Sequence, residues 1–140
     1  MLVHATTIDI AGLGVLIEGV SGAGKSDLAL RLIAEGALLV ADDQTEVEIA
    51  GDALRARSPA TISGLIEARG VGIVPVPIKA ATRLRLAVAL ASGPVERMPE
   101  PRAWSLPDGR GPRIPLIELH AFEQSTPEKL RRALESVPIA

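Results

Sequence analysis

The chain of 140 residues has no cysteine and no tyrosine, and its only aromatic side chains are Trp104 and Phe122. The absence of cysteine excludes disulfides and thiolate metal sites, and it is typical of proteins of a reducing cytoplasm. Because aromatic residues are so few, the core has to be built from Leu, Ile, Val and Ala. The length suits one domain, so we expect a single domain over residues 1–140.

The chain also lacks a large net charge and a long apolar run. Its formal net charge is −2, and lysine is scarce, with 3 Lys against 12 Arg. This balance does not favour nucleic acid as the main partner. No apolar run approaches the ~18 residues of a membrane span, and the sequence predicts no signal peptide. We therefore expect a cytoplasmic protein that binds neither nucleic acid nor membranes.

One of the three lysines, Lys25, belongs to an octapeptide that fits G-x-x-x-x-G-K-[ST], the Walker A phosphate-binding loop. In such a loop the backbone N–H groups surround phosphate oxygens, the lysine adds positive charge, and the final hydroxyl can ligate Mg²⁺. The pattern predicts ATP and Mg²⁺ as cofactors. The predicted nucleotide-binding residues are Gly19, Val20, Ser21, Gly22, Ala23, Gly24, Lys25 and Ser26.

The flanking sequence supports this interpretation against an ordinary glycine turn. Residues 15–17 form a short apolar run of strand type, and residues 26–35 place Leu28, Leu32 and Ile33 on one helical face. The motif is therefore predicted to lie on strand–loop–helix, with phosphate at the helix N-terminus.

The rest of the chain predicts an α/β fold. We expect a P-loop kinase-like core with a mixed, largely parallel sheet, an N-terminal β-hairpin and a C-terminal helix. The apolar run 37–41 is typical of a buried parallel strand that completes a right-handed βαβ unit. The predicted strands are 2–10, 15–18, 37–41, 46–49, 53–56, 62–68, 71–76, 84–90 (with a helix as the alternative) and 114–119; the predicted helices are 25–35 and 126–136.

In the C-terminal third, the sequence predicts a long irregular segment followed by a helix. Residues 92–115 contain six prolines and no clear periodicity, which indicates a long mobile loop or a segment ordered by a partner. The helix 126–136 is expected to have Thr126 as its N-cap and Pro127 at its first helical position.

Asp42 and Asp43 directly follow the predicted strand 37–41. Parallel neighbours in a βαβ unit present their carboxyl ends at the same edge, so these carboxylates should face a bound triphosphate. At least one could hold Mg²⁺ or accept a proton from an attacking hydroxyl. The alternative is that the pair simply begins a polar turn.

For three further charged or titratable residues, local sequence alone does not predict a function. Glu67 stands in an apolar strand, where a charge is costly unless it is paired or bound to a metal. His4 near the chain start and Arg97 in the proline-rich segment are by default solvated.

Read in order, four motifs resemble the catalytic C-terminal domain of the bacterial HPr kinase/phosphorylase family. They are a histidine-bearing hairpin that runs into the phosphate loop, an Ala-Asp-Asp acidic motif, a Glu-Ala-Arg-Gly-Val-Gly segment, and an arginine in Val-Glu-Arg-Met. The resemblance spans about residues 3 to 98.

The resemblance implies a role for each matching residue. Lys25 would bind phosphate, and Ser26 with Glu67 would hold Mg²⁺, with Asp42 as a further candidate metal ligand. Asp43 would be the general base toward a serine hydroxyl. His4 would support the reacting phosphate, and Arg97 would stabilise charge during transfer.

The same resemblance implies an ATP-dependent serine kinase of an HPr-like phosphocarrier protein of the bacterial phosphotransferase system, which also acts by phosphorolysis in reverse. It implies a short form without the family's N-terminal domain, and homo-oligomers, typically hexamers. Three features depart from the family pattern. Ala5 follows His4 where glycine is usual, and Asp27 follows Ser26 where glutamate is usual. Residues 109–113 only loosely match the C-terminal arginine-rich segment tied to phosphorolysis.

Two other functions remain open at this point. A P-loop kinase of a small metabolite usually carries a lid with several arginines, for which Arg97, Arg102, Arg110 and Arg113 are candidates. The second alternative is a non-catalytic module that senses ATP. The presence of both His4 and Asp43 argues against it, because ATP binding alone requires neither residue.

Overall fold

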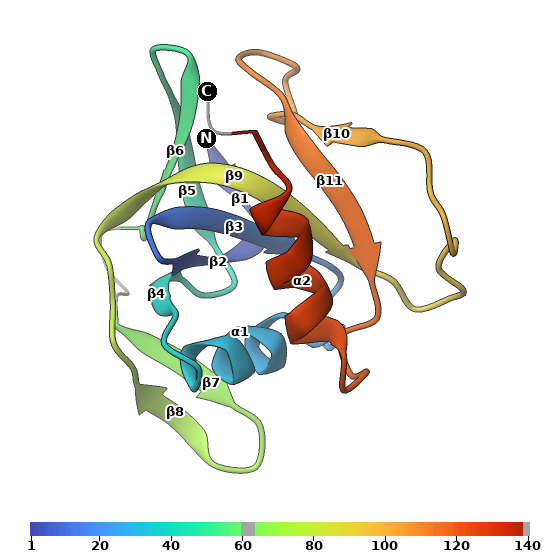
Figure 1. The fold of residues 1–140 in the computed structure, drawn as a ribbon. Coiled ribbons are helices and arrows are strands. Elements are labelled where there is room, and N and C mark those ends of the chain that lie inside the picture. The colour runs from blue at the N-terminus through green and yellow to red at the C-terminus, as the bar shows by residue number, and fades with distance from the viewer. Residues whose placement is uncertain (60–63, 139–140) are drawn as a thin grey trace.

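A computed structural model describes residues 1–59 and 64–138. It has two helices, α1 (Lys25–Ile33) and α2 (Thr126–Glu135), around a nine-stranded sheet and a two-stranded sheet (Figure 1). The strands are β1 (Leu2–Val3), β2 (Ala5–Ile10), β3 (Leu13–Glu18), β4 (Leu38–Ala41), β5 (Thr45–Ala50), β6 (Ala53–Arg57), β7 (Leu65–Ala68), β8 (Gly72–Pro75), β9 (Ala81–Leu90), β10 (Arg102–Trp104) and β11 (Ile114–Leu119).

The large sheet is mixed, as predicted, but it is not largely parallel. Its strand order is β1-β5-β6-β9-β3-β2-β4, and β11 pairs with both β9 and β10. Among the described strands, only the pairings of β9 with β3 and with β11 are parallel. The prediction of predominant parallel pairing is wrong because hairpins connect β2 to β3 and β5 to β6, and strands joined by short turns must pair antiparallel.

The predicted βαβ unit also needs correction. β4 does not lie next to β3, because β2 is inserted between them and pairs antiparallel with both. The antiparallel partner shared by β3 and β4 makes these two strands run in the same direction. Their carboxyl ends therefore still lie at the same edge of the sheet, and this is the feature that positions the site.

Two apolar clusters hold the layers together. Residues of α1 and α2 pack with one face of the central strands, and in Figure 1 the two helices lie next to each other on one side of the sheet. The other face is covered by the β5–β6 hairpin and by residues near β10 and β11. In β3, Val15 and Ile17 belong to the first cluster and Leu16 to the second. Residues 15–17 form a continuous apolar run because the strand is buried on both faces.

The prediction of a long loop over residues 92–115 is wrong for its central part. β10 pairs antiparallel with β11, and both Trp104 and Leu106 are buried in the second cluster. A three-residue strand between prolines is too short to show a periodicity, which is why the sequence pattern does not reveal it.

The remaining predicted elements are confirmed with shifted bounds. The strand 84–90 is a strand and begins earlier, at Ala81, while residues 62–63 of the strand predicted over 62–68 lie outside the described residues. Helix α2 begins at Thr126, so Ser125 rather than Thr126 is its N-cap. The hydroxyl of Thr126 instead donates to the carbonyl of His120, which ties the helix start to the preceding turn.

Neither helix in the described part of the chain is long and apolar enough to cross a membrane.

Candidate functional site

The segment between β3 and α1 forms a compact loop. The N–H of Ala23 donates to the carbonyl of Val20 at 3.0 Å, and Gly22 and Gly24 adopt left-handed φ angles of 83° and 105°. A Cβ atom on Gly24 would lie 2.6 Å from the Cβ of Ala121, which is closer than real Cβ contacts. The positive φ and the missing space together require glycine at this position.

The end of this loop is an anion-binding arrangement. Gly24 is the N-cap of α1 and has no side chain with which to cap it, so the first-turn N–H groups remain available to a ligand. Lys25 is 5% exposed, and its ammonium group donates to the carbonyls of Gly19 at 2.8 Å and Val20 at 3.2 Å. The charge of a buried lysine and the positive end of a helix dipole thus lie in the same loop.

A cavity of about 400 Å³ opens beside the loop. It brings together the loop, the first turns of α1, the acidic end of β4, the β7–β8 hairpin and the turn before α2. The lining residues are Ser21, Gly22, Gly24, Lys25, Ser26, Asp27, Leu30, Asp42, Asp43, Glu67, Ala68, Arg69, Val71 and Phe122.

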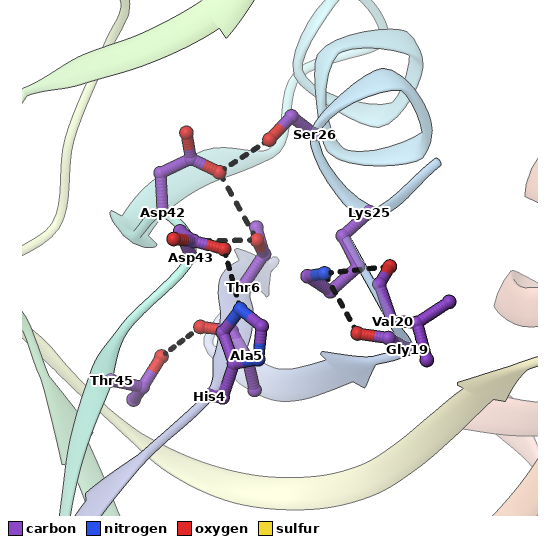
Figure 2. Close-up of polar contacts among 10 residues, drawn as sticks. All are labelled: His4, Ala5, Thr6, Gly19, Val20, Lys25, Ser26, Asp42, Asp43 and Thr45. Carbon is purple, nitrogen blue, oxygen red and sulfur yellow. Dashed lines mark hydrogen bonds and ion pairs between the residues drawn. The ribbon is translucent and has the colours of Figure 1, made fainter. Parts of the chain in front are cut away.

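Asp42 accepts hydrogen bonds from three segments of the chain, and Figure 2 shows those from Ser26 and Thr6. Its Oδ1 accepts hydrogen bonds from the hydroxyl of Ser26 at 2.7 Å and from the hydroxyl of Thr6 at 3.1 Å. Its Oδ2 accepts from the backbone N–H of Glu67 at 3.3 Å. The Asp42 carboxylate therefore holds the start of α1, β2 and the β7–β8 hairpin at one point.

Asp43 pairs with His4, which lies at the break between β1 and β2. The Nε2 atom of His4 is 2.8 Å from Oδ1 of Asp43, and both side chains are more than half exposed (Figure 2). Asp43 has a left-handed φ of 65°, an uncommon conformation for a residue other than glycine. Its backbone N–H donates to the hydroxyl of Thr6 at 3.0 Å. This bond holds the strained backbone in place, and the Asp43 carboxylate remains accessible from solvent.

The predicted metal ligands Ser26, Asp42 and Glu67 all line the cavity. No group of three or more His, Cys, Asp or Glu side chains among the described residues could hold a metal ion by itself. Mg²⁺ takes oxygen ligands and is usually bound through one or two carboxylates together with substrate phosphates. A hydroxyl and two carboxylates beside a phosphate loop fit that mode of binding, whereas they would not form a metal cage made of protein alone.

Arg97 is the predicted catalytic residue whose place at the site the structure does not support. Arg97 is exposed and is not among the described residues that line the cavity. Three residues that sequence reasoning did not assign do belong to the site: Thr6, Arg69 and Phe122. Thr6 could have been found as a hydroxyl two positions after His4, at the start of β2. Arg69 stands inside a recognised motif, and Phe122 gives no local signal.

Comparisons with known proteins point to one family. Residues 1–92 match the family model described as HPr Serine kinase C-terminal domain. The HPr kinase/phosphorylase of Clostridium acetobutylicum is 48% identical over 75 residues, which cover 54% of this chain and 25% of that protein. The HPr kinase/phosphorylase of Halalkalibacterium halodurans is 51% identical over 75 residues, covering 53% and 24%.

The similarity in three dimensions extends over more of the chain. The solved structure of the Hpr(Ser) kinase/phosphatase from Coxiella burnetii matches with a TM-score of 0.82 at 26% identity, covering 96% of this chain and 94% of that one. By contrast, the chain spans about a quarter of the length of the curated relatives it matches.

Proposed function

The chain belongs to the family of the HPr serine kinase C-terminal domain, and from that premise we propose that it transfers the γ-phosphoryl group of ATP to a serine of a small HPr-like phosphocarrier protein. The observation that carries the proposal is that Asp43, paired with His4, and the phosphate loop around Lys25 border one cavity. A carboxylate that can receive a hydroxyl proton is thus placed next to a site suited to a triphosphate.

The phosphate loop would bind the nucleotide. The ammonium group of Lys25 would exchange its carbonyl partners, Gly19 and Val20, for phosphate oxygens. Ser26, Asp42 and Glu67 would hold Mg²⁺, which when bound neutralises charge on the β- and γ-phosphates. The free N–H groups at the start of α1 would contact the same phosphates.

Asp43 would orient the serine hydroxyl and receive its proton. Phosphoryl transfer passes through a loose transition state, so positioning and charge neutralisation matter more than the strength of the base. His4 would support the reacting phosphate and, through its 2.8 Å contact, hold the Asp43 carboxylate in one orientation. In the reverse reaction, inorganic phosphate would attack phosphoserine and a protonated Asp43 would return the proton.

Arg97 would stabilise charge in the transition state. Because its side chain is exposed and outside the described cavity lining, this role requires a movement of its segment or its supply by a second copy of the chain. We also propose that the chain forms a homo-oligomer, typically a hexamer, in which a neighbouring copy could supply this arginine. The proposed location of the protein is the cytoplasm.

Two other functions are less well supported. A kinase of small metabolites needs an arginine lid, but Arg102 pairs with Glu118, and Arg110 pairs with Asp108. A non-catalytic ATP sensor would need neither partner of the His4–Asp43 pair.

One experiment separates these functions. The protein is incubated with Mg-ATP and the phosphocarrier of its own organism, and intact masses are measured. One added phosphate on a serine, lost in Asp43→Ala, is expected of the kinase. Transfer only to small metabolites, or ATP binding without transfer, would contradict the proposal in favour of the metabolite kinase or the sensor. Excess inorganic phosphate added to the phosphorylated carrier tests the reverse reaction.

A further inference from the structure

Phe122 is one of two aromatic residues in the chain, and it lies at the edge of the cavity. Its neighbour Ala121 is buried in the core under α1 and α2, whereas Phe122 itself is 69% exposed. A Cβ atom on Gly24 would come within 2.8 Å of Cζ of the Phe122 ring. The ring therefore borders the phosphate loop at the start of α1.

The backbone around Phe122 is tied down on both sides. Arg31 of α1 donates to the carbonyl of Ala121 and, at 3.2 Å, to the carbonyl of Glu123. Arg31 is itself held by an ion pair with Asp27, another residue of the cavity lining, at 3.2 Å. An exposed apolar ring is thus presented on a turn that α1 fixes in place.

Exposure alone would not make Phe122 a binding residue, because single exposed apolar side chains are common on protein surfaces. Ile73 on β8 is equally exposed, at 70%, but it is not among the described residues that line the cavity. Phe122 differs in three ways: its ring is flat, its turn is fixed, and it stands beside the only recognised phosphate-binding motif of the chain. Leu30 and Val71 add further apolar surface to the same lining.

We propose that Phe122 is the platform on which the purine base of the nucleotide stacks; this inference rests on the proposed nucleotide site. The phosphates would lie at the loop and the N-terminus of α1, and the base would cover the ring that now faces solvent. Stacking uses the face of the base and not the hydrogen-bonding groups at its edge, so both ATP and GTP should benefit. Inorganic tripolyphosphate has no base and should gain nothing from Phe122.

The test compares equilibrium binding of Mg-ATP and of Mg-tripolyphosphate by titration calorimetry. Phe122→Ala is expected to weaken ATP binding about 5- to 150-fold, since base–aromatic stacking contributes about 1–3 kcal/mol per base. The same variant should bind tripolyphosphate as the wild type does. Phe122→Trp, which keeps a flat ring, should retain ATP binding, and Phe122→Leu, which keeps apolar volume without a ring, should not. Ile73→Ala is the control of matched exposure and should change neither affinity.

Two results would overturn the platform: unchanged ATP affinity in Phe122→Ala, or an equal loss of affinity for ATP and tripolyphosphate. The second result would mean that the ring shapes the phosphate loop through its contact with Gly24. Failure of the proposed kinase function gives a different result. In that case the Phe122 variants would separate ATP from tripolyphosphate as expected, but the wild type would transfer no phosphate to the carrier protein.

Discussion

The hydroxyl of Ser26, in the first turn of α1, donates a 2.7 Å hydrogen bond to Oδ1 of Asp42, the residue that follows β4. This bond connects the phosphate loop to the acidic end of β4, although β2 separates β4 from β3 in the sheet. A hydroxyl and a carboxylate at this distance can both face one Mg²⁺ ion.

Removing the charge of Asp42 should therefore act on the metal. Asp42→Asn keeps an oxygen that accepts from Ser26 and Thr6, but it provides a neutral ligand. We expect the Mg²⁺ concentration for half-maximal ATP binding to rise about tenfold or more. A magnesium titration of ATP binding measures this, with Asp52→Asn, an exposed residue in the β5–β6 turn, as the control. An unchanged magnesium requirement would exclude Asp42 from the metal site.

Asp43 should matter for transfer and not for binding. Asp43→Asn keeps the shape of the side chain but cannot accept a proton, so kcat for phosphorylation of the carrier should fall by about 10²–10⁴ with ATP affinity unchanged. Because the His4–Asp43 pair is exposed, its loss should change the free energy of unfolding by less than about 1 kcal/mol. Single-turnover transfer and urea unfolding measure the two effects. Equal losses in ATP affinity and rate would instead place Asp43 in nucleotide binding.

Thr6 should act through the two aspartates. Its hydroxyl donates to Asp42, accepts from the N–H of Asp43 and is fully buried. Thr6→Val keeps the volume but leaves that N–H without its partner, so we expect a loss of about 1–3 kcal/mol in stability and a lower kcat. Thr6→Ser restores the hydroxyl and should recover both. A variant Thr6→Val with full activity would show that the Asp43 backbone needs no such support.

Much of the fold could be predicted because its signals are local. The phosphate loop, the β5–β6 hairpin and α2 each carry their own turn, cap or periodicity within a few residues. Sheet order carries no such signal. The insertion of β2 between β3 and β4 depends on packing of the whole hairpin, so the predicted parallel neighbours were wrong even though both strands were located correctly.

In the site, too, the residues that stand in local motifs could be predicted, and those placed by tertiary contacts could not. Lys25, Ser26, Asp42, Asp43 and Glu67 stand in motifs, and the structure brings all five to one cavity. Phe122 comes from a turn more than 90 residues after the phosphate loop, and only tertiary contacts, such as those of Arg31, place it there. Arg97 is the opposite case: it stands in a motif, but its side chain is not among the described residues that line the cavity.

Because Trp104 is buried, we predict that the proline-rich segment around it contributes to the stability of the fold. This residue is 7% exposed, and its Nε1 donates to Oε2 of Glu18 at 3.1 Å. Trp104→Ala should lower the free energy of unfolding by about 3–5 kcal/mol, because it leaves a cavity in the second apolar cluster. Trp104→Phe should lose less. Urea unfolding measures both, and a change below about 0.5 kcal/mol for Trp104→Ala would be the result expected of a loop outside the core.

Asp9 should make the stability of the protein depend on acid pH. Asp9 is 2% exposed, and its Oδ2 accepts from Thr82 at 2.6 Å and from Lys79 at 3.0 Å. Its Oδ1 accepts from the N–H of Gly12 at 2.8 Å in the β2–β3 turn. Burial alone would raise the pKa of Asp9, but the hydrogen bonds from Thr82, Lys79 and Gly12 and the charge of Lys79 outweigh it and hold the pKa below its ordinary value.

The sign of the effect follows from that lowered pKa. Near and below the unfolded-state pKa of about 3.9, the unfolded chain binds more protons than the folded one. The stabilisation by Asp9 is therefore complete above that pH and is lost as the pH falls through the folded-state value. Asp9→Asn should lower stability at pH 6 by about 2 kcal/mol, since it removes charge-assisted hydrogen bonds.

The same variant should lose less stability than the wild type between pH 6 and pH 3, as measured by urea unfolding at both pH values. Asp52→Asn, which changes an exposed carboxylate, should follow the wild type at both. If Asp9→Asn lost as much stability over this interval as the wild type does, the acid sensitivity would have to come from other carboxylates. The bonds from Lys79 and Thr82 would then not favour the charged form of Asp9 in the folded state.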